Sequence, residues 1–263
     1  MCISESVGRG GRNANSDVKT VQVLLNVGLN TIGLATPLTE DGIVGTGTLA
    51  AIEKLQRHVM GIANPSVCIE PKSPALLRLQ AFLSEGFSSV KLKGILIDAS
   101  EPDVNKYADA MAAKMHDRQI TTPFRQAHFL AQVGHESGHL HYAEELASGE
   151  AYEGRSDLGN NEPGDGVRFK GRGLIQLTGR ANYLRYGQAI GKDLVTDEHW
   201  KQVAEDPGLA VDVACWYWDV HQLNQYADLD DVVTITKRIN GGLNGLDERQ
   251  ALLIRGKFFL AGT

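Results

Sequence analysis

Residues 124–145 read Phe-Arg-Gln-Ala-His-Phe-Leu-Ala-Gln-Val-Gly-His-Glu-Ser-Gly-His-Leu-His-Tyr-Ala-Glu-Glu, and this stretch decides the fold. Its small and apolar residues recur three or four positions apart, which is the period of one buried helical face. They are Ala127, Leu130, Ala131 and Gly134. Pro123 stands where a first-turn proline opens a helix. The pattern predicts a buried helix that carries one acidic residue, Glu136, near its end.

Glu136 has the surroundings that a general acid needs. Apolar neighbours disfavour the charged form of a carboxylate, so Glu136 can hold a proton near neutral pH. On a continuous helix, Glu145 would lie about 13 Å away on roughly the opposite face. Gly138 is a poor helix former, so we expect the helix to end there and the chain to bring Glu145 across a cleft. An inverting glycosidase uses two carboxylates separated by room for water. The spacing fits equally a solvated Glu145 beside Glu144.

Residues of the same stretch also match a metal-binding motif. Residues 135–139, His-Glu-Ser-Gly-His, fit H-E-x-x-H, which on a helix presents two imidazoles to zinc with the glutamate as general base. Gly138 lies between the histidines, where a zinc helix must continue. Glu162 and Asp165 are possible third ligands, but they lie in a loop rich in proline and glycine. A zinc peptidase or amidase is therefore the alternative, and the main prediction has no metal and no cofactor.

The composition is that of a globular protein. The 263 residues are 42% hydrophobic and 22% charged, enough for one large or two smaller cores. A net charge of −6 gives no overall basic field for nucleic acid, so we expect no nucleic-acid partner. No apolar run approaches the length of a membrane span, so we expect no membrane insertion. We also expect a monomer. The N-terminal residues contain no apolar segment of the signal-peptide kind. Three widely spaced cysteines predict reduced thiols, which is typical of a cytoplasmic origin.

Helical periodicity predicts a mainly α fold with little β structure. Three short amphipathic patterns, at about 17–28, 46–59 and 73–83, predict a small three-helix bundle over 1–86. Residues 87–94 are polar and predict a linker. Residues 95–263 then predict a larger, lysozyme-like helical domain.

The first domain resembles a known family. Residues 21–25 (Val-Gln-Val-Leu-Leu), 41–45 (Asp-Gly-Ile-Val-Gly), and Thr48 followed by Ala51, Ile52 and Gln56 are similar to the V-Q-x-L-L, D-G-x-x-G and T-x-x-A-[IV]-x-x-x-Q pattern of three-helix peptidoglycan-binding domains. The resemblance covers about residues 12–62. It implies binding to the cell-wall polymer and identifies no contact residue; a helical domain that only packs on its neighbour is the alternative.

Two tracts of the second domain suit a sugar ligand. Residues 148–173 are rich in glycine, which lets a backbone loop approach a bulky ligand. In the next block, Gln176, Thr178 and Asn182 can place amide and hydroxyl groups on one wall, which suits hydroxyl and acetamido groups. Residues 214–218, Ala-Cys-Trp-Tyr-Trp, offer sugar-stacking aromatics, but their helical spacing favours core packing.

The ordered motifs of residues 127–132, 135–137, 170–178, 182–183 and 239–242 resemble the family 19 glycoside hydrolases, which have the plant-chitinase-like fold. Residues 145–155, with Gly164-Asp-Gly and Gly171-Arg-Gly-Leu-Ile-Gln-Leu-Thr-Gly-Arg180, are more similar to bacteriophage endolysins. The resemblance spans about residues 105–260. It implies hydrolysis of β-1,4 glycosidic bonds with inversion and without a metal.

The resemblance also implies roles for single residues. Glu136 would be the general acid, Glu145 the general base that activates water, and Thr178 a ligand of that water, where plant enzymes typically carry serine. The implied substrate-binding positions are Gln176, Asn182, Asn240, Arg249 and Tyr152, with Arg249 matching a buried arginine that contacts the carboxylates.

The resemblance of the first domain indicates which polymer is the substrate. Chitin and peptidoglycan are both β-1,4-linked and both contain N-acetylglucosamine, and this chain lacks the disulfides and extra loops of plant chitinases. The bundle favours peptidoglycan. We therefore expect a muramidase-type endolysin that stays in the host bacterial cytoplasm until its release to the periplasm and wall at lysis. A chitinase, and a wall-binding protein with an inactive second domain, are the alternatives.

Overall fold

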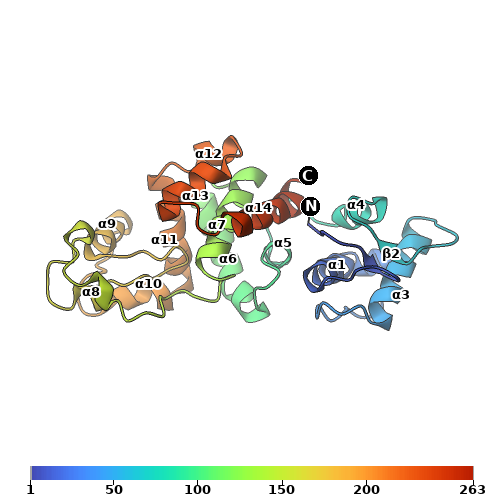
Figure 1. The fold of residues 1–263 in the computed structure, drawn as a ribbon, viewed down its shortest axis with the longest axis horizontal. Helices are drawn as coiled ribbons and strands as arrows, with labels where there is room; N and C mark the ends of the chain where they lie inside the picture. Colours follow the sequence, from blue (N-terminus) through green and yellow to red (C-terminus); the bar gives the residue numbers. More distant parts are fainter. Residues whose placement is uncertain (1, 263) are drawn as a thin grey trace. The chain divides into compact units, whose positions relative to one another are not determined.

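The computed structural model describes residues 2–262, of which helices form the bulk (Figure 1). The chain is 57% helix and 3% strand, so the predicted mainly α fold is confirmed. It divides into two compact units: unit 1 holds the residues up to Asp98 and those from Leu253 onward, and unit 2 is Ala99–Leu252. Among residues 2–262, no helix combines the length and apolarity needed to cross a bilayer.

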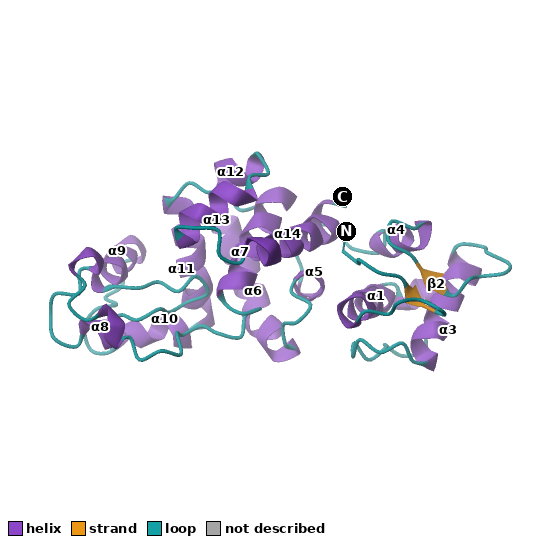
Figure 2. Ribbon diagram, in the orientation of Figure 1, coloured by secondary structure: helices purple, strands orange, loops and turns teal. Residues whose placement is uncertain are grey.

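Unit 1 contains the three predicted helices and a small sheet. Its helices are α1 (Asn15–Val27), α2 (Leu29–Ile32), α3 (Thr46–Lys54), the π-helical turn η1 (Leu55–Val59), α4 (Pro74–Gln80) and α5 (Ser89–Ile95). Strands β1 (Val7–Gly8) and β2 (Cys68–Ile69), orange in Figure 2, pair antiparallel with Val7 opposite Ile69. The predicted patterns correspond to α1, to α3 with η1, and to α4.

The motif residues of unit 1 hold the unit together from inside. Gln22 on α1 is 1% exposed, and its amide nitrogen donates to the Asp41 carboxylate, the Ile43 carbonyl and the Thr48 hydroxyl. Its amide oxygen accepts the Gly42 N–H at 2.9 Å. The bond from Gln22 is the main reason why the pKa of Asp41 is lowered. The V-Q and D-G positions therefore join α1 to the loop before α3.

The structure places the boundary between the units differently from the sequence. The predicted linker at 87–94 contains most of α5, whose Leu92 and Ile95 are buried. The Arg255 guanidinium donates to the carbonyls of Gly94 and Ile95, both at 3.1 Å from its Nε. The end of the last helix, α14 (Leu246–Ala261), is therefore part of unit 1. A seven-residue pattern is too short to reveal this periodicity, and its partner lies far along the chain.

Unit 2 is built around the helix of the deciding stretch. Its elements are α6 (Glu101–Asp117), α7 (Pro123–Glu136), η2 (Glu150–Tyr152), η3 (Ser156–Leu158), α8 (Asp165–Arg168), α9 (Arg180–Ile190), η4 (His199–Lys201), α10 (Gln202–Glu205), α11 (Pro207–Val220), α12 (Asn224–Asp228), α13 (Val232–Asn240) and the start of α14 (Leu246–Ala261). Helix α11 packs on α6 and α10, and α12 packs on α7 and α13 (Figure 1). Trp218 is buried with its ring edge-to-face on Phe129, and Trp216 is also buried, as the helical spacing predicted.

Helix α7 begins and ends as its sequence predicted. The Thr122 hydroxyl accepts the Arg125 N–H at the N-terminus, and Pro123 occupies the first turn. The helix ends at Glu136, and the Ser137 hydroxyl then donates to the Val133 carbonyl at 2.6 Å. Residues 138–140 all have left-handed backbone angles, with φ between +55° and +72°. This tight turn sends the chain back toward the loop that carries Glu145.

We expect Gln22→Ala to weaken unit 1 by about 2–4 kcal/mol, because it leaves the Gly42 N–H without its acceptor and creates a cavity. Amide hydrogen exchange in α1 should accelerate accordingly, and because α1 belongs to unit 1, this measurement reports the stability of unit 1 separately from that of the rest of the chain. Asn30→Ala, at an exposed position of the same unit, should leave this exchange unchanged. Equal protection of α1 in both variants would contradict the structural role of Gln22.

Candidate active site

Glu136 is held by a buried cation. The Arg249 guanidinium, 1% exposed, donates to the Glu136 carboxylate and to the Gln132 amide oxygen, both at 2.5 Å. Its Nε donates to the Asn244 carbonyl at 3.3 Å. The expected contact between Arg249 and the predicted general acid is thus present in the structure. The expected apolar surroundings are wrong in one respect, because the group nearest to the carboxylate is a charged guanidinium.

Asn240 belongs to the loop that supports this arginine. Its amide nitrogen donates to the Asn244 carbonyl at 2.9 Å, and its amide oxygen accepts the Gly242 N–H at 2.8 Å. The same Asn244 carbonyl accepts from Arg249. Both polar ends of the Asn240 side chain therefore shape the loop between α13 and α14, and the loop in turn positions Arg249.

The two histidines of the possible zinc motif are bound to a carboxylate. Helix α7 ends between them, so they are not presented one helical turn apart as a zinc helix requires. The Glu248 carboxylate accepts from both rings, at 2.7 Å from His135 Nδ1 and 3.2 Å from His139 Nε2. The proposed third ligands, Glu162 and Asp165, both bind Arg180.

Within residues 2–262, no three His, Cys, Asp or Glu side chains are grouped so that they can hold a metal ion. The helix end and the occupied carboxylates therefore remove the geometric basis of the zinc alternative.

Glu145 is a held carboxylate and not a freely solvated one. Its two oxygens accept the Tyr152 hydroxyl at 3.0 Å and the Gly171 N–H at 3.1 Å. Burial and this bond to Glu145 raise the pKa of Tyr152, so the phenol remains a donor near neutral pH. The neighbouring Glu144 points elsewhere and pairs with the buried Arg172 at 2.9 Å. Adjacent glutamates thus have different partners, and only Glu145 is bound by neutral donors.

A cavity of about 360 Å³ brings together some of the predicted site residues, but Tyr152, Asn240 and Arg249 do not line it. Gln176, Thr178 and Asn182 line it together, on the side where Asn182 donates to the Thr178 carbonyl at 2.8 Å. Trp216 and Tyr217 of α11 line it as well. The cavity therefore combines amide and hydroxyl groups with aromatic surface, as a site for a sugar requires.

Both predicted catalytic carboxylates lie close to residues of this cavity. Burial, and then the charge of Glu136, raise the pKa of Tyr217, so this carboxylate acts electrostatically on an aromatic residue of the cavity. On the other side, a Cβ added to Gly171 would lie 2.7 Å from the Gln176 amide oxygen and 3.3 Å from the Glu145 carboxylate. A larger residue at 171 would therefore displace the end of the Gln176 side chain.

Comparisons with known proteins agree with this geometry. A family model described as "Chitinase class I" of the glycosyl hydrolase 19 family matches residues 103–243, more than half of the chain. The chain belongs to glycoside hydrolase family 19. A Haemophilus influenzae protein described as "Glycosyl hydrolase family 19 domain-containing protein" is 34% identical over 171 residues, covering 53% of this chain and 82% of the relative.

Two further proteins, one of known sequence and one of known structure, also resemble this chain. An endochitinase of Arabidopsis thaliana is 39% identical over 117 residues, covering 44% of this chain but only 38% of the plant protein. The crystal structure of chitinase C from Streptomyces griseus has a TM-score of 0.54 at 22% identity, and the match covers 68% of this chain and 95% of that one. This family 19 chain is therefore a glycoside hydrolase with the fold of the bacterial chitinase.

Sequence reasoning missed several residues of the family 19 site. Gln132 lies one helical turn before Glu136, a spacing that signals a shared face. The only sequence feature that marked Gly171 was its position in a glycine-rich motif. Tyr217 lies in a run of aromatic residues whose helical spacing predicted core packing. Glu248 had no signal, because its partners His135 and His139 lie more than 100 residues earlier.

We expect Tyr152→Phe to lower kcat about tenfold, because the Glu145 carboxylate loses one of its two donors, an effect of about 1.4 kcal/mol. Steady-state hydrolysis of a soluble glycan measures this loss. Tyr142→Phe removes an exposed hydroxyl in the preceding turn and should have no effect. A Tyr152→Phe variant with full activity would exclude Tyr152 as a support of a working carboxylate.

Proposed function

We propose that this family 19 hydrolase is an endolysin that cleaves the β-1,4 glycosidic bonds of bacterial peptidoglycan with inversion at the anomeric carbon. One observation supports it above all: Glu136 is bound to a buried guanidinium and lies near a cavity lined by amide, hydroxyl and aromatic groups. On the far side of Gln176, the second carboxylate is held by neutral donors.

In the proposed reaction, protonated Glu136 donates its proton to the glycosidic oxygen as the bond from C1 to that oxygen breaks. The Arg249 guanidinium stabilises the carboxylate that remains, and this favours proton donation. Glu145 takes a proton from a water molecule that attacks C1 from the opposite face. Thr178 holds that water, and the product has the inverted configuration. The Tyr152 and Gly171 donors orient Glu145 for this task.

Peptidoglycan is the proposed substrate because of unit 1. Its Gln22, Asp41, Gly42 and Thr48 form the internal network described above, so the motif shared with peptidoglycan-binding domains corresponds here to a folded helical unit. A wall-binding unit would keep the hydrolase on its polymeric substrate and raise the local concentration of glycan. A chitinase is the second candidate, since the plant relatives are described as endochitinases.

The setting that we propose follows from this substrate. The enzyme would act as a monomer on the wall of a bacterial host during phage-induced lysis, after release from the host cytoplasm. It would need neither nucleic acid nor membrane insertion. Its free thiols, Cys2, Cys68 and Cys215, are compatible with a reducing compartment before release.

We expect Glu136→Gln to lower kcat on purified sacculi at least about 100-fold, because the amide keeps a polar contact with Arg249 but has no proton to donate. Loss of turbidity of the sacculi measures the rate, and thermal unfolding confirms that the variant is folded. Glu150→Gln, an exposed acid of the same tract, is the matched control. Substantial residual activity in a clean preparation of Glu136→Gln would refute the proposed acid.

We expect EDTA to leave the rate on sacculi unchanged, because the proposed steps use only protein side chains and water. The reducing-end sugar of the released fragments, identified by mass spectrometry, reports which glycosidic bond is cut. Inactivation by the chelator with recovery on adding zinc would favour the peptidase or amidase alternative. Release of peptides without new reducing ends would do the same.

A further inference from the structure

The cavity near the catalytic carboxylates carries unpaired positive charge at its edge. Arg185 of α9 and His221, just after α11, both line it and are both exposed. Arg238 of α13 lies beside them: its carbonyl accepts the Tyr217 hydroxyl at 2.9 Å, and the His221 ring stacks on Tyr217 with centroids 4.1 Å apart.

The two arginines act electrostatically on the His221 ring. Burial, and then the charges of Arg185 and Arg238, lower the pKa of His221, so the ring is neutral near neutral pH and can offer a hydrogen bond but no charge. Neither arginine has a carboxylate within ion-pair distance among the described residues, and no acidic residue lines this cavity. The Arg238 guanidinium lies over the Tyr226 ring, 4.6 Å from its centroid.

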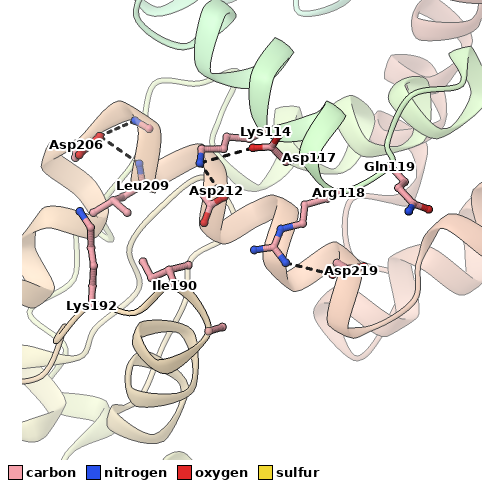
Figure 3. Close-up of a pocket in the computed structure, with 12 residues that line it drawn as sticks. Lys114, Asp117, Arg118, Gln119, Ile190, Lys192, Asp206, Leu209, Asp212 and Asp219 are labelled. Atoms are coloured by element: carbon pink, nitrogen blue, oxygen red, sulfur yellow. Dashed lines mark hydrogen bonds and ion pairs between the residues drawn. The ribbon is translucent and has the colours of Figure 1, made fainter.

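A larger cavity of the same unit shows the opposite arrangement (Figure 3). It measures about 720 Å³, and four aspartates line it. Lys114 pairs with Asp212 at 3.5 Å, and Arg118 pairs with Asp219 at 3.3 Å. Lys114 and Arg118 are therefore paired with acids that line the same cavity, whereas no acidic residue lines the cavity beside Arg185.

We propose that Arg185, His221 and Arg238 form an anion subsite that binds a carboxylate carried by the glycan chain. This inference rests on the proposed function, because peptidoglycan carries such groups and chitin does not. The carboxylate can belong to the lactyl ether of muramic acid or to the peptide attached to it. A guanidinium binds a carboxylate through two parallel hydrogen bonds, which gives the subsite both strength and orientation.

The overall charge gives such a subsite a clear role. At −6 the chain repels an anionic polymer at long range. A positive edge next to the cavity reverses this field where the glycan enters, and it selects substituted sugars over neutral ones. The subsite therefore acts on specificity, whereas Glu136 and Glu145 act on the bond that is cut.

The test compares Arg185→Gln with the charge-conserving Arg185→Lys and with Lys192→Gln, which removes a charge at the larger cavity. Three substrates are used: soluble glycan strands that carry peptides, the same strands stripped by an amidase to free lactyl carboxylates, and neutral N-acetylglucosamine oligomers. For Arg185→Gln we expect KM on the anionic strands to rise at least about fivefold, with a smaller change in kcat. The ratio of kcat/KM between anionic and neutral substrates should fall with it.

In Arg185→Lys, the ratio of kcat/KM on anionic strands to kcat/KM on neutral oligomers should return close to the wild-type value. In Lys192→Gln this ratio should equal that of the wild type. Raising NaCl from about 50 to 300 mM should lower the ratio of the wild type far more than that of Arg185→Gln. An effect on peptide-bearing strands alone assigns the carboxylate to the peptide, and an effect that persists on stripped strands assigns it to the lactyl group.

A ratio that Arg185→Gln leaves unchanged, or that Lys192→Gln lowers equally, would overturn the subsite while the proposed function stands. A wild-type enzyme that cleaves only the neutral oligomers would overturn the proposed function, and the anion subsite with it.

Discussion

The buried Arg249 guanidinium is the interaction on which the catalytic unit depends. A buried charge is costly unless it is paired and fully hydrogen-bonded. Arg249 meets this condition with the Gln132 amide, the Glu136 carboxylate and the Asn244 carbonyl. These three partners come from the end of α7 and from the loop before α14. The need to satisfy one cation therefore fixes the position of the predicted general acid.

The same requirement explains why neighbouring glutamates differ. Glu144 and Glu145 are adjacent, yet Glu144 compensates the buried Arg172 while Glu145 accepts only a phenol and a backbone amide. The charge of Glu144 is compensated by Arg172, whereas Glu145, held by neutral donors, keeps its charge available to a water molecule. Electrostatic partners, more than position in the chain, thus separate Glu144 from the candidate general base.

Unit 1 shows what a motif resemblance encodes. Gln22, Asp41, Gly42 and Thr48 are the residues that carry the resemblance, and they bind one another. Gln56, the last position of the motif, bonds to the backbone of Val67 and Cys68 in the same way. The motif is therefore a signature of a fold and does not by itself identify a binding surface.

Local sequence determined the elements whose causes are local. Helix α7 follows from its apolar period, its Thr122 cap with Pro123, and the glycine at 138 that ends it; the burial of Trp216 and Trp218 follows from helical spacing. The ordered motifs also sufficed for the family. Tertiary structure alone decided that α5 and the end of α14 belong to unit 1, that Glu248 joins His135 to His139, and that Arg185 and His221 line the same cavity. Such contacts join residues up to 253 positions apart, as Arg255 and Cys2 show, and no local period records which side chains packing will bring together.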